Sequence, residues 1–128
     1  MKLLLDAHAV IWAVDEPSRL GTRAMTAMQD PANELMFSSG SVWELAIKLS
    51  LGKLKLSVPF RQWIETAVAD LGLTMLPIGL EHAEMQTRLS FHHRDPFDRL
   101  LVAQASVEGI DLISADAVFD QYGIRRVW

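Results

Sequence analysis

The segment HHRDPFDRLLVAQA, residues 92–105, contains two acidic residues three positions apart. Asp95 stands directly before Pro96, and an acid followed by proline is typical of a helix start, so Asp95 is expected to cap this helix. Asp98 opens the apolar stripe of the same helix, and its carboxylate should therefore point toward the interior. A buried carboxylate without a positive partner is costly, and no base lies on this stripe, so Asp98 needs a cation from elsewhere.

Three further acids occupy positions that a structural role also explains. Asp6 and Asp116 each follow an apolar run, and each is a suitable helix N-cap. Glu44 forms a capping-box pattern with Ser41. It also stands four residues before Lys48, which favours an ion pair on one helix face. Taken singly, none of these three acids requires a functional site.

The combination of the four acids changes this interpretation. Asp6 and Asp116 end expected strands, whereas Glu44 and Asp98 begin expected helices, so in a doubly wound sheet all four belong to the same rim. Several carboxylates in one pocket repel each other and raise one another's pKa values. A divalent cation makes such a group stable, and oxygen ligands without cysteine suit Mg²⁺ or Mn²⁺.

The histidines do not show the spacing of a zinc site. Zinc enzymes often place two histidines one helical turn apart, as in the HExxH pattern, and no such pair occurs here. His8 is expected near the rim, and His82 is expected on the surface. His92 and His93 are expected in a loop, where they contact at most a substrate.

Length and composition limit the function classes. The chain has 128 residues, which suits one domain over residues 1–128, and half of them are apolar. The absence of cysteine excludes disulfides and thiolate metal sites. The net charge is −4 and the bases are scattered, so binding of nucleic acid would depend on metal ions or a local groove. No apolar window approaches the ~20 residues of a membrane span. We therefore expect a cytoplasmic protein without membrane contact.

Strand and helix patterns alternate along the whole chain. The apolar runs predict strands at 2–5, 34–39, 73–78, 110–114 and 124–128. Helical spacing predicts helices at 9–14, 22–29, 41–51, 60–70, 80–89 and 96–107. This alternation is typical of an α/β fold with three α/β/α layers and a central parallel sheet. In such sheets the ligand crevice lies at the carboxyl ends of the strands, where Asp6 and Asp116 are expected.

Four segments, in this order, resemble the PIN domain and more narrowly the VapC-type toxins of prokaryotic toxin–antitoxin pairs. They are LLLDAHAVIWAV, SSGSVWELAIKLSLGKL, HHRDPFDRLLVAQA and LISADAVFDQYGIRRVW. The acids of the family match Asp6, Glu44, Asp98 and Asp116, and its supporting hydroxyl residue matches Ser114. One departure follows the first acid, where Ala7 replaces the hydroxyl residue that is common in relatives.

The resemblance implies a metal-dependent endoribonuclease. Asp6, Asp98 and Asp116 would hold one or two Mg²⁺ or Mn²⁺ ions, with Glu44 completing the shell or orienting water. Cleavage would leave a 5′-phosphate and a 3′-hydroxyl. Four bases are weak candidates for guiding the RNA strand: Arg94, Arg99, Lys48 and Lys53.

The resemblance also implies protein partners. A cognate antitoxin would cover the acidic pocket with its C-terminal segment, and the toxin would form a homodimer. Trp43 and Trp63 are expected in the core because of their helical spacing, with antitoxin binding as the alternative for both.

Three other functions fit an α/β chain of this size. A phospho-receiver domain is disfavoured, because the first expected strand ends in a single acid and the third ends without Asp. A nuclease acting on structured DNA usually carries further acids and extra arms. A PIN-fold interaction module without catalysis would have no need of four retained acids.

Overall fold

The computed structural model describes residues 1–128 and contains one five-stranded sheet. The strands lie in the order β3-β2-β1-β4-β5, and every neighbouring pair is parallel. Their bounds are Lys2–Leu5 (β1), Glu34–Ser38 (β2), Leu73–Leu76 (β3), Asp111–Ile113 (β4) and Arg126–Val127 (β5). All five strands lie where the sequence predicts them, and all except β1 are shorter than predicted.

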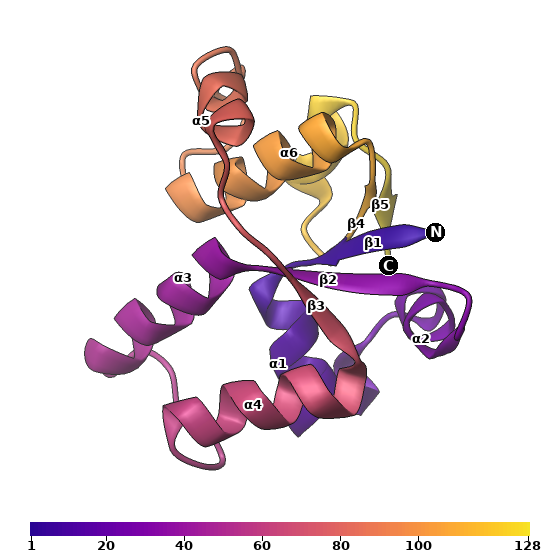
Figure 1. The fold of residues 1–128 in the computed structure, drawn as a ribbon, viewed down its shortest axis with the longest axis vertical. Helices are drawn as coiled ribbons and strands as arrows, with labels where there is room; N and C mark the ends of the chain where they lie inside the picture. The colour runs from indigo at the N-terminus through magenta and orange to yellow at the C-terminus, as the bar shows by residue number, and fades with distance from the viewer.

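Helices cover both faces of this sheet (Figure 1). On one face lie α1 to α4, and on the other lie α5 and α6. The helix bounds are Ala7–Asp15 (α1), Thr22–Gln29 (α2), Ser39–Ser50 (α3), Phe60–Leu71 (α4), Leu80–Gln86 (α5) and Pro96–Glu108 (α6). Two 3₁₀ helices, Pro17–Arg19 (η1) and Ala117–Tyr122 (η2), complete the chain. The predicted α/β/α architecture with a parallel sheet is confirmed.

The alternation of side chains along β1 builds two separate cores. Leu3 and Leu5 join the apolar cluster beneath α1 to α4, which includes Trp63. Leu4 points to the opposite face and joins the cluster beneath α6, which includes Leu101. Successive residues of a strand face opposite sides, so one continuous apolar run supplies both cores of a sheet that is covered on both faces.

The start of α3 differs from the sequence prediction. Strand β2 runs into α3 without a loop, and Ser38 is the N-cap, with its hydroxyl accepting a hydrogen bond from the Gly40 N–H at 3.1 Å. The capping box predicted between Ser41 and Glu44 is therefore wrong. Because the helix starts two residues earlier than expected, Glu44 lies deeper in the helix, where it cannot reach the cap.

The sheet order places a topological switch point between β1 and β4. From β1 the chain builds β2 and β3 toward one edge, and it then returns to build β4 and β5 on the other side of β1. The connections on the two sides of a switch point diverge and leave a crevice at the carboxyl ends of the strands. Asp6 follows β1 at this point, and Ser114 follows β4.

None of the helices is both long enough and apolar enough to cross a membrane.

Candidate active site

Asp6 and Ser114 lie side by side at the end of the central strands. The Asp6 side chain is buried and is the N-cap of α1, where Oδ1 accepts a hydrogen bond from the Ala9 N–H at 2.8 Å. Burial raises the pKa of Asp6 above its usual value, and hydrogen bonds from Ser114 and Ala9 oppose this rise. The predicted capping role of Asp6 is confirmed, and the same carboxylate faces the crevice.

The first turn of α6 presents Asp98 to the same crevice. Asp95 is the N-cap of this helix, and its Oδ1 accepts hydrogen bonds from the Phe97 N–H at 2.8 Å and the Asp98 N–H at 3.3 Å. Burial and the neighbouring charge of Asp95 raise the pKa of Asp98 to about 7, His93 opposes this rise, and Glu44 and Asp6 add to it. The predicted cap is confirmed for Asp95, and the carboxyl group of Asp98 lines the same cavity.

Asp116 comes from the other side of the crevice. It is the N-cap of η2, and its Oδ1 accepts a hydrogen bond from the Val118 N–H at 3.0 Å. Its own N–H donates to the hydroxyl of the buried Ser114 at 3.0 Å. Ser114 therefore links the strand end that carries Asp6 to the turn that carries Asp116.

Glu44 approaches from α3 together with a base. Its side chain is buried, and Lys48 Nζ lies 3.0 Å from its Oε2, which confirms the ion pair predicted from their spacing. The Lys48 side chain lines the same pocket and keeps 34 % of its surface exposed.

All four predicted acids line one cavity of about 110 Å³. Its remaining walls are Asp95, Lys48, Ala7 and His8. Five carboxylates thus face a single ammonium group among the cavity walls. The methyl group of Ala7 stands in the wall at the position where the resemblance led us to expect a hydroxyl.

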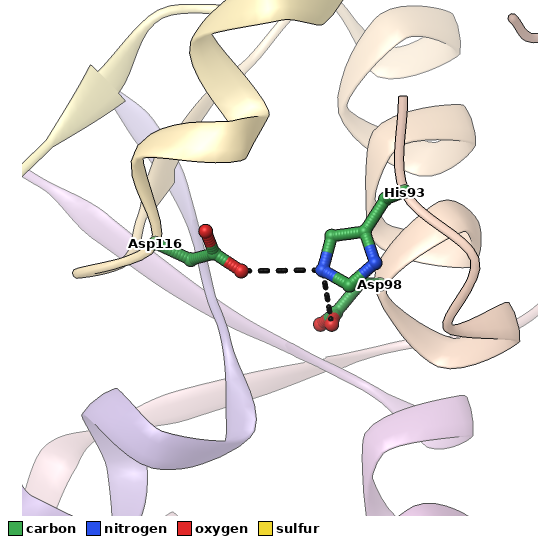
Figure 2. A group of neighbouring side chains, drawn as sticks. All are labelled: His93, Asp98 and Asp116. Atoms are coloured by element: carbon green, nitrogen blue, oxygen red, sulfur yellow. Dashed lines mark hydrogen bonds and ion pairs between the residues drawn. The ribbon is translucent and has the colours of Figure 1, made fainter. Parts of the chain in front are cut away.

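His93 is the site residue that the sequence analysis missed. Its Nε2 lies 3.0 Å from Asp98 Oδ2 and 3.2 Å from Asp116 Oδ2, as Figure 2 shows. The sequence analysis limited His93 to contact with a substrate, because it lies in the loop before the Asp95 cap. Its separation from Asp98 by only five positions was the available signal, since a loop that leads into a helix N-terminus lies beside the first turn.

The donor set of this centre fits a divalent cation. One ligand atom from each of His93, Asp98 and Asp116 falls within 4.8 Å of the others. Carboxylate oxygens are the ligands that Mg²⁺ and Mn²⁺ prefer, and the five carboxyl groups of this cavity share one ammonium group, that of Lys48.

Several other residues lie elsewhere than predicted. Arg99 does not fit the predicted role of guiding a strand, because it is only 3 % exposed. Its guanidinium binds the main-chain carbonyls of Leu89, Ser90 and His93. His82 is buried between Gly79 and Glu108 instead of lying on the surface, because it hydrogen-bonds to both.

The remaining candidates divide between surface and core. Arg94 lies exposed in the loop before α6, and Lys53 lies exposed after α3. Trp63 is buried in the core as predicted. Trp43 is 67 % exposed on α3, so its predicted core position is wrong.

Comparison with known proteins identifies the family of this fold and site. The sequence model of the PIN domain matches residues 3–124. The chain belongs to the PIN domain family. The predicted family is thereby confirmed over nearly the whole chain, including every acid that lines the cavity of this PIN domain.

This PIN domain is similar to ribonuclease VapC22 of Mycobacterium tuberculosis (strain ATCC 25618 / H37Rv). The two are 29% identical over 114 residues, which cover 89% of this chain and 86% of the relative. The fold is also similar to that of VapBC2 from Rickettsia felis bound to a promoter DNA fragment, with a TM-score of 0.69, 14% identity and full coverage of both chains. VapBC-1 from nontypeable Haemophilus influenzae gives a TM-score of 0.69 at 17% identity, covering 98% of this chain and 96% of that one.

Proposed function

We propose that this PIN domain is a metal-dependent endoribonuclease of the VapC toxin type. The observation that carries the proposal is the cavity in which Asp6, Glu44, Asp98 and Asp116 converge at the carboxyl ends of the strands. The similarity to a relative named as a ribonuclease supports RNA as the substrate class.

In this proposal Asp6, Asp98 and Asp116 hold Mg²⁺ or Mn²⁺. Such an ion, held by these residues, would neutralise charge on the phosphodiester and would lower the pKa of a water molecule, so that a hydroxide nucleophile would be available near neutral pH. Glu44 would orient this water or complete the ligand shell. Lys48 remains partly exposed at the cavity, where its ammonium can contact a phosphate oxygen, and the exposed Arg94 can bind the strand beside it. Cleavage leaves a 5′-phosphate and a 3′-hydroxyl.

A protein antitoxin is the proposed regulator. Two structures with this fold are VapBC complexes, in which the toxin fold occurs with its antitoxin. A basic side chain of the antitoxin would be attracted to the cavity, because the acids there outnumber the single lysine. The homodimer that the resemblance implies stays a prediction, and light scattering of the isolated chain tests it.

The test is cleavage of a mixed RNA pool by the wild type and two matched variants. We expect cleavage with Mg²⁺ or Mn²⁺ and none with EDTA. Asp98→Asn should lose at least a hundredfold in rate, because electrostatic stabilisation by a metal site contributes several kcal/mol. Asp95→Asn should keep most of its activity, since Asn also caps helices well.

Three results would contradict the proposal. Full activity of a folded Asp98→Asn variant would show that Asp98 is not a required metal ligand and that the site is wrongly assigned. Cleavage of structured DNA in place of RNA would favour the alternative nuclease. Antitoxin binding without cleavage by any form would favour an interaction module.

A further inference from the structure

Arg99 is a buried cation that no carboxylate neutralises. Its Nη1 donates to the carbonyl of Ser90 at 2.8 Å and of His93 at 3.5 Å, and its Nη2 donates to that of Leu89 at 3.4 Å. The guanidinium carbon also lies 4.0 Å from the centre of the Phe91 ring. Burying a charge without a carboxylate partner is costly, so these contacts with carbonyl dipoles and one aromatic ring are needed to stabilise Arg99. Every one of these partners belongs to the loop that leads into α6. Arg99 thus fixes the path of this loop.

The same loop holds the His93 ring in one orientation. The Asp95 N–H donates to His93 Nδ1 at 3.2 Å, so Nδ1 is an acceptor and the ring proton is on Nε2. Nε2 donates to Asp116 Oδ2 at 3.2 Å and contacts Asp98 Oδ2 at 3.0 Å. The His93 N–H in turn donates to the Tyr122 hydroxyl at 2.7 Å, which ties the loop to η2.

We propose that Arg99 is a positioning residue of the acidic site and that it acts through His93. By holding the loop, Arg99 keeps the Nε2–H group of His93 between the carboxyl groups of Asp98 and Asp116, 3.0 Å and 3.2 Å from their Oδ2 atoms. A metal ion that binds these carboxylates must displace this group. The inference rests on the proposed function only in taking Asp98 and Asp116 as metal ligands.

The alternative is that His93 itself is a metal ligand. A ligating Nε2 must present a lone pair, so the ring proton would move to Nδ1. Nδ1–H would then face the Asp95 N–H at 3.2 Å, donor against donor. The observed loop conformation therefore favours His93 as a competitor of the metal.

The first measurement needs no metal. Nitrogen NMR of the metal-free protein reports the tautomer of each histidine. We expect His93 in the Nε2–H form in the wild type and averaged between tautomers in Arg99→Met. Arg88→Met is the matched control, because Arg88 is an exposed arginine that pairs with Glu84 of α5 and binds none of the carbonyls that Arg99 holds, and it should leave the His93 signal unchanged. A fixed Nε2–H signal in Arg99→Met would overturn the positioning role.

The second measurement is the affinity for Mn²⁺ by titration calorimetry. His93→Ala removes the competitor and should bind Mn²⁺ roughly tenfold more tightly, since a hydrogen bond to a charged group is worth at least about one decade in an equilibrium constant. Arg99→Met should also bind Mn²⁺ more tightly than the wild type does. The double variant should match His93→Ala alone, because two residues acting through one contact are not additive.

Weaker Mn²⁺ binding by His93→Ala would overturn the inference and make His93 a ligand. Additive effects in the double variant would show that Arg99 acts separately from His93. If Arg99→Met fails to fold, Arg99→Lys replaces it, because lysine keeps the charge but loses the forked donors of the guanidinium. The Mn²⁺ affinity of Arg99→Lys should lie between that of the wild type and that of His93→Ala. Absence of Mn²⁺ binding by the wild type would refute the proposed metal site, while the NMR result would still decide the link between Arg99 and His93.

Discussion

At the scale of single residues, the site holds charge that the protein alone does not balance. Asp98 contacts only one nitrogen donor from a side chain, the Nε2 of His93, while Asp95, Glu44 and Asp6 raise its pKa by repulsion in addition to burial. A carboxylate with a pKa near neutrality at the start of a helix is unusual, because the helix dipole normally favours the charged form there. Burial and acid crowding outweigh the dipole at Asp98.

The raised pKa of Asp98 predicts a pH dependence of stability in the metal-free protein. The folded state holds a proton on Asp98 up to about pH 7, whereas the unfolded state releases it near its ordinary pKa of 3.8. The stabilising contribution is therefore complete below about pH 4 and is lost as pH rises through about 7. Thermal melts in EDTA should show a steeper decline over this range for the wild type than for Asp98→Asn. If the melting temperatures of the two proteins changed with pH in parallel, Asp98 would not be the source of the pH dependence.

At the scale of secondary-structure elements, helix starts position the acids. Asp6 and Asp116 cap α1 and η2, and Asp98 lies in the first turn of α6. Each of these elements begins at the carboxyl edge of the sheet, and the N–H groups of their first turns donate to the capping carboxylates that line the cavity. Capping and convergence are therefore parts of the same arrangement, and a structural explanation of each acid does not compete with a functional one.

The cap of α6 predicts a measurable stability effect. Asp95→Ala removes the acceptor of two N–H groups, those of Phe97 and Asp98, and should lower the free energy of unfolding by about 1 kcal/mol. Asp70→Ala, which removes an exposed acid at the end of α4, is the control and should change it by less than about 0.5 kcal/mol. Urea denaturation measures both, and equal values for the two variants would exclude a capping contribution.

At the scale of the whole molecule, one strand joins the site to both cores. β1 pairs with β2 and β4 and places Asp6 at its end, while Leu3, Leu4 and Leu5 fill the layers on the two faces. The cavity is therefore built on the central strand of the sheet. A rigid support of this kind is what a metal site requires, because ligand positions must be kept within a fraction of an ångström.

A core truncation tests this support. Leu4→Ala empties a fully buried position beneath α6 and should cost about 2–5 kcal/mol of unfolding free energy. Leu51→Ala, at an exposed position after α3, should cost less than about 0.5 kcal/mol. Guanidinium denaturation measures both. A small effect at Leu4 would mean that the α6 layer contributes little to the stability of the sheet.

The sequence by itself determined the elements and the acids. Apolar runs followed by polar ends are local patterns, so the five strands, the caps Asp6 and Asp95, and the pairing of Glu44 with Lys48 could all be predicted from neighbouring residues. The parallel sheet followed from the alternation of strands with helices, and this alternation also placed the strand ends, with their acids, at one edge.

Only the tertiary structure decided which residues outside these patterns reach the site. His93 and Arg99 lie near each other in sequence, yet the path of the loop before α6 depends on hydrogen bonds to its carbonyls and to Tyr122, and neither leaves a periodic signal. The exposure of Trp43 and the burial of His82 likewise depend on which helix packs against which. Local spacing determines the helix or strand face on which a residue lies. Long-range packing determines whether that face contacts solvent, another element or the site.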